Sequence, residues 1–291
     1  SNGDVNIYDV KREGASWGVP IESSAGMEGS HMDPVWQLKW IVKGAERLET
    51  LVSISTDGRI LEWNLKKGLV MSKLMQLKKS GAGEGWISNS SAGLCFDFSP
   101  ADASTYVTGT EDGNLFRCSV SYNEQYLETY QNHEGPVYRV RFSNRWANVF
   151  LSCSADWSMN LYHLSLKDSL LSIRATAENF PINDICWCPD NATVFACVTV
   201  DAKLQIWDLS VSSIDPVVIL DIGSEDLQND NNNNNANNES SELPRSPSDL
   251  HSLPNSPALG ASRYGDRYDP NNANSNTSAN VTPVARLLKN L

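Results

Sequence analysis

Short stretches in which apolar and polar residues alternate recur along the first 222 residues of the chain. Four of them end in an aromatic residue and begin similar units, at 35–40, 94–98, 137–142 and 182–187. Each is followed by a second apolar stretch, a turn that contains Asp, and a third alternating stretch. Because successive side chains of a strand point to opposite faces, the alternation predicts β-strands, and the order of the stretches predicts repeated antiparallel sheets.

The turn aspartates give the period of the repeat. Asp57, Asp112, Asp156 and Asp201 are 55, 44 and 45 residues apart. The last two intervals match the roughly 40–45 residues of a WD-repeat blade. The longer first interval contains the Gly- and Ser-rich stretch 80–91, which predicts a loop inserted between two blades. We therefore expect an all-β fold, a partial WD40-type β-propeller with about four to five blades of an expected seven.

The same pattern sets the expected domain boundaries. Residues 1–222 are expected to form the partial propeller, with blade pieces at 1–10, 33–79, 92–130, 133–167 and 181–222. Residues 2–9 match the third stretch of later units, so the chain is expected to begin partway through a blade, as a fragment. Residues 223–280 are rich in Asn, Ser and Pro and lack Trp and Phe, which predicts a disordered insertion. Residues 281–291 are expected to return to ordered chain.

The turn aspartates have a structural and a catalytic interpretation. Four carboxylates on four separate blades are too far apart for shared acid/base chemistry. In the WD repeats that this pattern resembles, the turn Asp accepts hydrogen bonds from turn amides and from a His before the blade. His133 has the position expected for that His relative to Asp156, and Tyr162 stands where Trp is common. The other blades are expected to lack the His. Asp57, Asp112, Asp156, Asp201 and His133 are therefore predicted to be structural.

Charge and motifs narrow the function classes. A net charge of −12 argues against direct binding to nucleic acid, an anionic membrane or the acidic microtubule surface. The sequence has no apolar run long enough to span a membrane and no signal peptide, so an intracellular protein is expected. The sequence contains no phosphate-binding loop motif and no nucleophile-elbow motif, and its six Cys form no CxxC pair. We expect no enzyme activity, no cofactor and no metal, with the Cys as mostly buried free thiols.

Protein partners are therefore expected, and three residues are candidate interface anchors. Trp157 follows a turn Asp at a position where two other blades have Gly, so its indole either packs on a neighbouring blade or contacts a partner. Arg139 and Trp36 lie near the start of first strands. Trp and Arg are the residue types that most often dominate binding energy at interfaces.

Beyond the generic repeat, several segments resemble axonemal dynein intermediate chains. They are Asp33–Trp40, Val52–Arg59, Gly109–Gly113, Cys118–Tyr130 and Leu151–Trp157, and the resemblance covers about residues 3–222. The stretches 121–130 and 212–216 are most similar to the intermediate chain of the two-headed inner-arm dynein, with the outer-arm chain as the alternative.

The resemblance implies a role, a location and a set of partners. The propeller would bind the tail of a dynein heavy chain within a complex that also holds a second intermediate chain and light chains. Association with the microtubule would be indirect, through that complex, in the axoneme of a cilium. A WD-repeat substrate adaptor of a ubiquitin ligase is the alternative from another class.

Overall fold

A computed structural model describes residues 2–11, 18–43, 48–65, 68–79, 90–175 and 179–223 of the 291-residue chain. The predicted insertion at 223–280, apart from its first residue, and the predicted ordered segment 281–291 lie outside these ranges, as does most of the loop predicted at 80–91. These three predictions are not tested by the structure.

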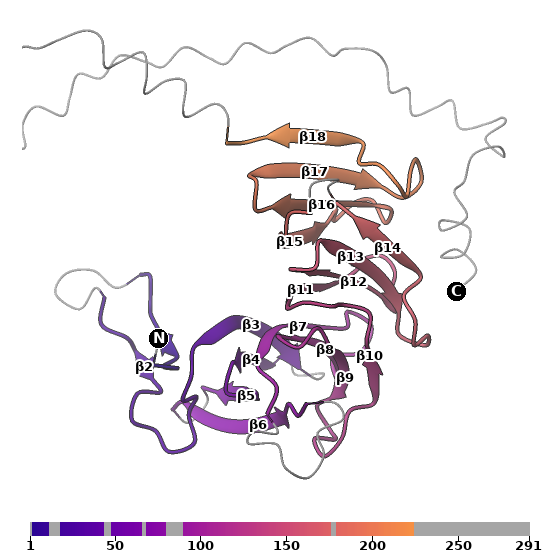
Figure 1. Ribbon diagram of the computed structural model, residues 1–291. Coiled ribbons are helices and arrows are strands. Elements are labelled where there is room, and N and C mark those ends of the chain that lie inside the picture. Colours follow the sequence, from indigo (N-terminus) through magenta and orange to yellow (C-terminus); the bar gives the residue numbers. More distant parts are fainter. Residues whose placement is uncertain are drawn as a thin grey trace, which may run out of the picture. The chain divides into compact units, whose positions relative to one another are not determined.

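The described ranges form eighteen strands and no helix, and so contain no helix that could cross a membrane. They make one two-stranded sheet, β1 (Asn6–Ile7) and β2 (Glu22–Ser23), and four four-stranded antiparallel sheets (Figure 1). In chain order, the strands of the four larger sheets are β3 (Val35–Lys43), β4 (Leu48–Ser55), β5 (Arg59–Asn64), β6 (Val70–Gln76); β7 (Gly93–Phe98), β8 (Thr105–Thr110), β9 (Leu115–Ser119), β10 (Glu128–Tyr130); β11 (Val137–Phe142), β12 (Val149–Ser154), β13 (Ser158–His163), β14 (Leu171–Arg174); and β15 (Ile182–Trp187), β16 (Val194–Thr199), β17 (Lys203–Asp208), β18 (Val218–Asp221). The predicted all-β fold with repeated four-stranded blades is confirmed.

Within each sheet the strands follow one another as a meander, and the first strands of neighbouring sheets lie side by side. Hydrogen bonds join these first strands directly. The Gln37 side chain donates to Phe96 O at 2.9 Å and accepts from Phe96 N at 3.1 Å. One sheet further on, Asp97 Oδ2 accepts from Phe142 N at 2.8 Å. The first strands therefore hold successive blades in register.

The third sheet is longer than the predicted piece 133–167, because its fourth strand, β14, ends at Arg174. This strand has only four residues and pairs with β13 from Ser158 to Leu161, so its alternation is too short to identify it in the sequence. At the amino end, β1 pairs with β2, which lies beyond the predicted piece 1–10.

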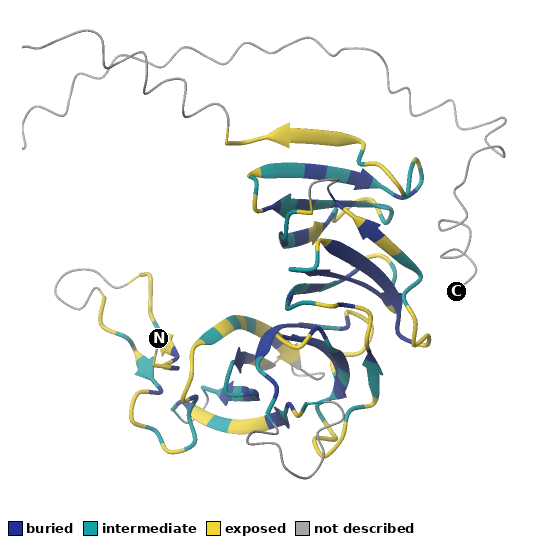
Figure 2. Cartoon of the chain, viewed as in Figure 1, coloured by how far each residue is buried: buried dark blue, intermediate teal, exposed yellow. Residues whose placement is uncertain are grey.

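The hydrophobic core is divided among the interfaces between successive sheets. Figure 2 shows in dark blue the strand residues that are buried. Ile54 and Met75 of the first sheet pack with Phe96 and Phe116 of the second. Similar clusters join the second sheet to the third and the third to the fourth. Since burying a large apolar side chain contributes about 1.5–3 kcal/mol, each blade depends on its neighbour for stability.

Two apolar faces at the ends of this series are exposed. Leu38 and Trp40 of β3 are 48% and 49% exposed, whereas Phe96, the equivalent of Leu38 in the second sheet, is fully buried. At the other end, Leu220 of β18 is 50% exposed and its equivalent Ile173 is 2% exposed. The pairing register defines these equivalences, because each pair stands at the same distance from its turn Asp. Both faces have the composition of an interface between blades.

Candidate functional site

The turn between β4 and β5 contains a complete hydrogen-bonded network. Asp57 Oδ2 lies 3.0 Å from His31 Nδ1, and His31 Nε2 lies 2.7 Å from Ser53 Oγ. The same hydroxyl accepts a hydrogen bond of 2.8 Å from Trp63 Nε1. The expectation that only the blade of Asp156 has the His was therefore wrong. His31 lies four residues before Val35, the spacing that separates His133 from Val137, so the sequence contained the signal.

The turn between β12 and β13 repeats the network with one change. His133 Nδ1 lies 3.0 Å from Asp156 Oδ2, and His133 Nε2 lies 2.6 Å from Ser152 Oγ. Asp156 also accepts from Glu134 N at 2.9 Å, and the position of the indole is taken by Tyr162, which is fully buried. The His belongs to the segment before the blade's first strand, so the network fastens that segment to the turn.

The remaining two turn aspartates have simpler partners. Asp112 accepts a 2.5 Å hydrogen bond from Ser91 Oγ, and its other oxygen lies 3.9 Å from Lys79 Nζ. Asp201 accepts from the hydroxyl of Thr199 and lies 2.7 Å from Lys203 Nζ. In both, the carboxylate is held by neighbours of its own turn or of the preceding segment.

Hydrogen bonding controls the ionisation of the two networked aspartates. Burial raises the pKa of Asp57, but hydrogen bonds from His31 and Arg59 outweigh it and lower the pKa to about 2. Burial also raises the pKa of Asp156, but the hydrogen bonds that this carboxylate accepts from His133 and Ser158 hold its pKa well below the ordinary value. A carboxylate that stays ionised and is surrounded by donors is suited to holding a turn, not to accepting protons near neutral pH.

A hollow of about 340 Å³ lies where the first strands of the four sheets converge. Each first strand has a β-bulge at its second position, where the pairing with the second strand shifts by one residue. The bulged residues are Trp36, Leu94, Tyr138 and Asn183, and all four line the hollow together with Arg139. A bulge redirects the side chain at that position, so one residue from each blade points to a common site.

Two of the three predicted anchors meet in this central hollow. Trp36 is 58% exposed, and the Arg139 Nε lies 3.2 Å from Asp184 Oδ1 of the next blade. Arg139 therefore already has an ion-pair partner within the chain. The sequence pattern did not single out Leu94, Tyr138 and Asn183, although aligning the second residue of each first strand would have found them.

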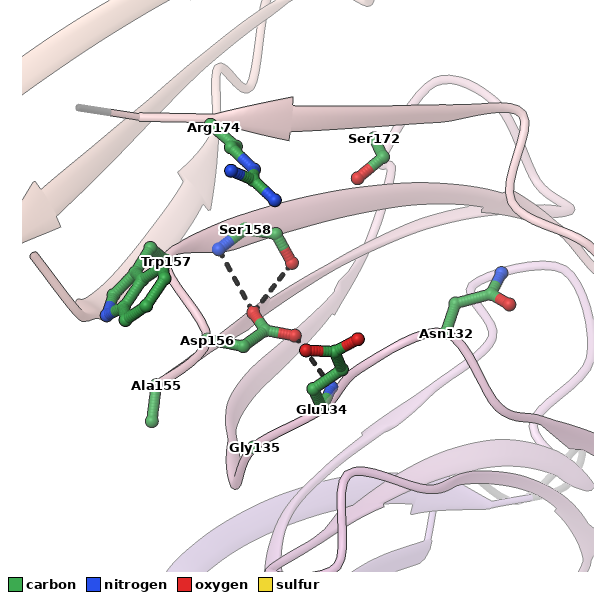
Figure 3. Close-up of a pocket in the computed structure, with 9 residues that line it drawn as sticks. All are labelled: Asn132, Glu134, Gly135, Ala155, Asp156, Trp157, Ser158, Ser172 and Arg174. Carbon is green, nitrogen blue, oxygen red and sulfur yellow. Dashed lines mark hydrogen bonds between the residues drawn. The ribbon is translucent and has the colours of Figure 1, made fainter. Parts of the chain in front are cut away.

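The third predicted anchor, Trp157, lines a different hollow, of about 370 Å³, at the β12–β13 turn (Figure 3). Its lining also includes Glu134, Asp156 and Arg174. Trp157 has a φ of 71°, in the left-handed region that favours Gly. The structure thus separates Trp157 from Trp36 and Arg139.

The thiols are mostly inside the sheets. Cys95, Cys118, Cys153 and Cys197 are buried, and burial raises the pKa of Cys95 to about 12, so these thiols stay protonated. The expected burial does not hold for Cys186, which is exposed, or for Cys188, which is partly so. Among the described residues, no group of three or more His, Cys, Asp or Glu is arranged to hold a metal ion.

Sequence comparisons identify relatives of this chain. Residues 169–208 match the family described as WD domain, G-beta repeat. This segment contains the last strand of the third sheet and the first three strands of the fourth, so the sequence repeat is offset from the blade by one strand. A weaker likeness, with a TM-score of 0.48 and 18% identity over 66% of this chain and 51% of the other, is to a crystal structure of the computationally designed Ika8 protein.

Dynein intermediate chains are similar over a longer stretch. Dynein axonemal intermediate chain 4 of Xenopus laevis is 41% identical over 75% of this chain and 31% of its own length. The mouse protein of the same name is 40% identical over 75% of this chain and 28% of its own. The 78 kDa intermediate chain of the flagellar outer arm of Chlamydomonas reinhardtii is 34% identical over 74% and 32%.

The chain spans about a third of the length of these curated relatives. Repeated four-stranded sheets, a WD-repeat match and extended similarity to several intermediate chains agree with one another. The resemblance predicted from the sequence is thus confirmed, and the chain is a WD-repeat relative of the axonemal dynein intermediate chains.

Proposed function

We propose that this chain is a non-catalytic scaffold subunit of an axonemal dynein and that its central hollow binds the tail of a heavy chain. The names of its relatives support membership of a dynein complex. The observation that carries the site is the convergence of four bulge residues, one from each sheet, on one hollow. A partner seated there would contact several blades at once.

The chemistry of the central hollow suits a protein partner. Trp36 offers a large exposed indole, and Leu94 and Tyr138 add apolar and aromatic surface around it. Aromatic residues in a recess that excludes water are typical of the few positions that dominate binding energy. A net charge of −12 disfavours direct contact with the acidic microtubule surface, so attachment to the axoneme would pass through the complex.

The remaining partners and the location follow from the same proposal. The complex would include a second intermediate chain and light chains and would act in the axoneme of a cilium. We place the chain in the two-headed inner-arm dynein on the resemblance of its segment 121–130 to that intermediate chain, with the outer arm as the alternative. Mass spectrometry of the heavy chain that co-purifies with the tagged full-length protein distinguishes the inner arm from the outer arm.

Pull-down of the heavy-chain tail by the full-length protein tests the central hollow. Trp36→Ala and Tyr138→Ala should each weaken capture at least about fivefold, which corresponds to the 1 kcal/mol threshold for a significant interface residue. Tyr122→Ala is the matched control, because Tyr122 is exposed and lies in the loop between third and fourth strands, at the opposite end of its sheet. It should bind as the wild type does.

Two outcomes would contradict the proposal at different levels. Capture unchanged by both Trp36→Ala and Tyr138→Ala would remove the central hollow as the binding site. A wild-type protein that retains no dynein heavy chain at all would refute the scaffold function itself.

A further inference from the structure

The residue after the turn Asp, or after its equivalent Asn2, has the same backbone conformation in all five described copies. Its φ is 78° at Gly3, 76° at Gly58, 81° at Gly113, 71° at Trp157 and 59° at Ala202. Glycine adopts this left-handed conformation without a steric penalty, whereas a bulky side chain is strained by it. The turn geometry is therefore common to the repeat, and Trp157 is the bulky exception.

Three of these turns have no room for a side chain. An added Cβ would lie 2.6 Å from His31 O at Gly3 and 2.8 Å from Ser91 O at Gly58, and it would be closer still to His133 O at Gly113. In each case the obstructing oxygen belongs to the segment that leads into the following blade. Those turns are sealed against the next blade, whereas the β12–β13 turn accommodates an indole.

Trp157 is not a residue of the hydrophobic core. The side chain belongs to none of the four hydrophobic clusters, and it is 37% exposed. Within the described part of the chain, its Nε1 has no hydrogen-bond acceptor. Backbone strain of this kind costs on the order of 1–3 kcal/mol and is concentrated at binding and catalytic sites.

The hollow beside Trp157 is dipolar. Arg174 comes from β14 on one side and Glu134 from the segment before β11 on the other, with Asp156 between them (Figure 3). Asp156 is occupied by His133, Ser158 and Glu134 N. Neither the Arg174 guanidinium nor the Glu134 carboxylate has an ion-pair partner among the described residues. The two free charges are thus of opposite sign, on either side of a recess that an indole also lines.

We propose that the Trp157 hollow is a second docking point, separate from the central hollow, for a protein segment that carries an acidic and a basic side chain around an apolar one. The acidic side chain would pair with Arg174, the basic one with Glu134, and the apolar one would pack on Trp157. A nucleic acid or an anionic lipid would satisfy Arg174 alone and be repelled by Glu134. This proposal rests on the proposed function, since the segment is taken to belong to the heavy-chain tail.

Trp157→Gly separates binding from folding, because the two effects should have opposite signs. Glycine relieves the strain at a φ of 71°, so the midpoint of thermal unfolding should stay the same or rise, while capture of the heavy-chain tail should fall at least about fivefold. Ala202→Gly is the matched control. It relieves strain at the equivalent turn and should leave capture unchanged.

Charge variants of the full-length protein test the chemistry of the partner. Glu134→Lys and Arg174→Glu should each weaken capture several-fold, and the loss should shrink as salt rises, since exposed charges are screened. Loss from Arg174→Glu with a gain from Glu134→Lys would instead indicate a purely anionic ligand and overturn the dipolar partner.

Other results bear on the proposal separately from the scaffold function. If Trp157→Gly lowers the unfolding midpoint by several degrees, the indole is a packing element and the docking point is refuted. If Trp157→Gly captures as well as the wild type while Trp36→Ala does not, the second docking point fails and the central hollow stands. If the wild type captures no heavy chain, the proposed function fails first.

Discussion

The Nδ1 of His133 lies 3.0 Å from Oδ2 of Asp156, joining the segment before a blade to the turn between that blade's second and third strands. Asp156→Ala removes this contact together with the bonds from Glu134 N and Ser158 N. Loss of charged hydrogen bonds at a part-buried site should cost about 2–3 kcal/mol, seen as a fall in the midpoint of thermal unfolding. Asp112→Ala, at a turn without the His, should cost less. Equal losses would show that the His contributes nothing.

Ser53 and Ser152 are equivalent but differently engaged. Ser53 Oγ lies within hydrogen-bond distance of both His31 Nε2 and Trp63 Nε1. Ser53→Ala leaves a fully buried indole N–H without its acceptor, so it should lower the free energy of unfolding by about 1–3 kcal/mol. In Ser152→Ala no indole is affected, because Tyr162 replaces the Trp, and the loss should be smaller. Urea unfolding of the two variants measures the difference, and a larger loss for Ser152→Ala would contradict it.

Asp57 should make stability depend on pH in the acid range. Its pKa is about 2 in the folded chain and near the ordinary value of 3.8 when unfolded, so the unfolded state binds the proton first as the pH falls. The stabilisation is full above about pH 4 to 5 and is lost as the pH falls through 3.8 towards 2, with a total of about 2 kcal/mol. Unfolding measured from pH 6 to pH 2 should decline more steeply for the wild type than for Asp57→Asn. Parallel curves would contradict this linkage.

The exposed face of β3 should make the chain of 291 residues self-associate when it is expressed alone. Leu38 and Trp40 are about half exposed, whereas the equivalents of Leu38 on the other first strands, Phe96, Val140 and Ile185, are buried. Light scattering coupled to size-exclusion chromatography should detect oligomers, and the double substitution Leu38→Lys with Trp40→Lys should reduce them. A monodisperse wild-type monomer would be the contrary result.

The repeat and its turns could be predicted from the sequence because they depend on local signals. Alternation predicted three of the first strands to within one residue and β3 to within three, and Asp57, Asp112, Asp156 and Asp201 marked the turns between second and third strands. The four-residue strand β14 could not be predicted, because it is defined by its pairing with β13 and not by a sequence pattern of its own. His31 was not predicted, although its spacing from the first strand is the same as that of His133.

The candidate site was predictable only in part, since it depends on how the blades are placed together. Residue type and position near the start of a first strand indicate Trp36 and Arg139, whereas their meeting in one hollow follows from bulges that only the pairing register reveals. The ion pair of Arg139 with Asp184 joins two blades and has no local signature. The Gly at equivalent positions indicates backbone strain at Trp157. Nothing in the sequence indicates the hollow beside it.

The offset between the matched repeat, 169–208, and the blades has a consequence for how such chains change in length. One repeat contributes its first strand to the outer edge of one sheet and its other three to the next. If a gene gains or loses one whole repeat, the sheets on either side of the junction still have four strands each. Duplication of one repeat therefore adds a blade without leaving an incomplete sheet. The sequence repeat can be duplicated as a unit even though its boundaries differ from those of the blade.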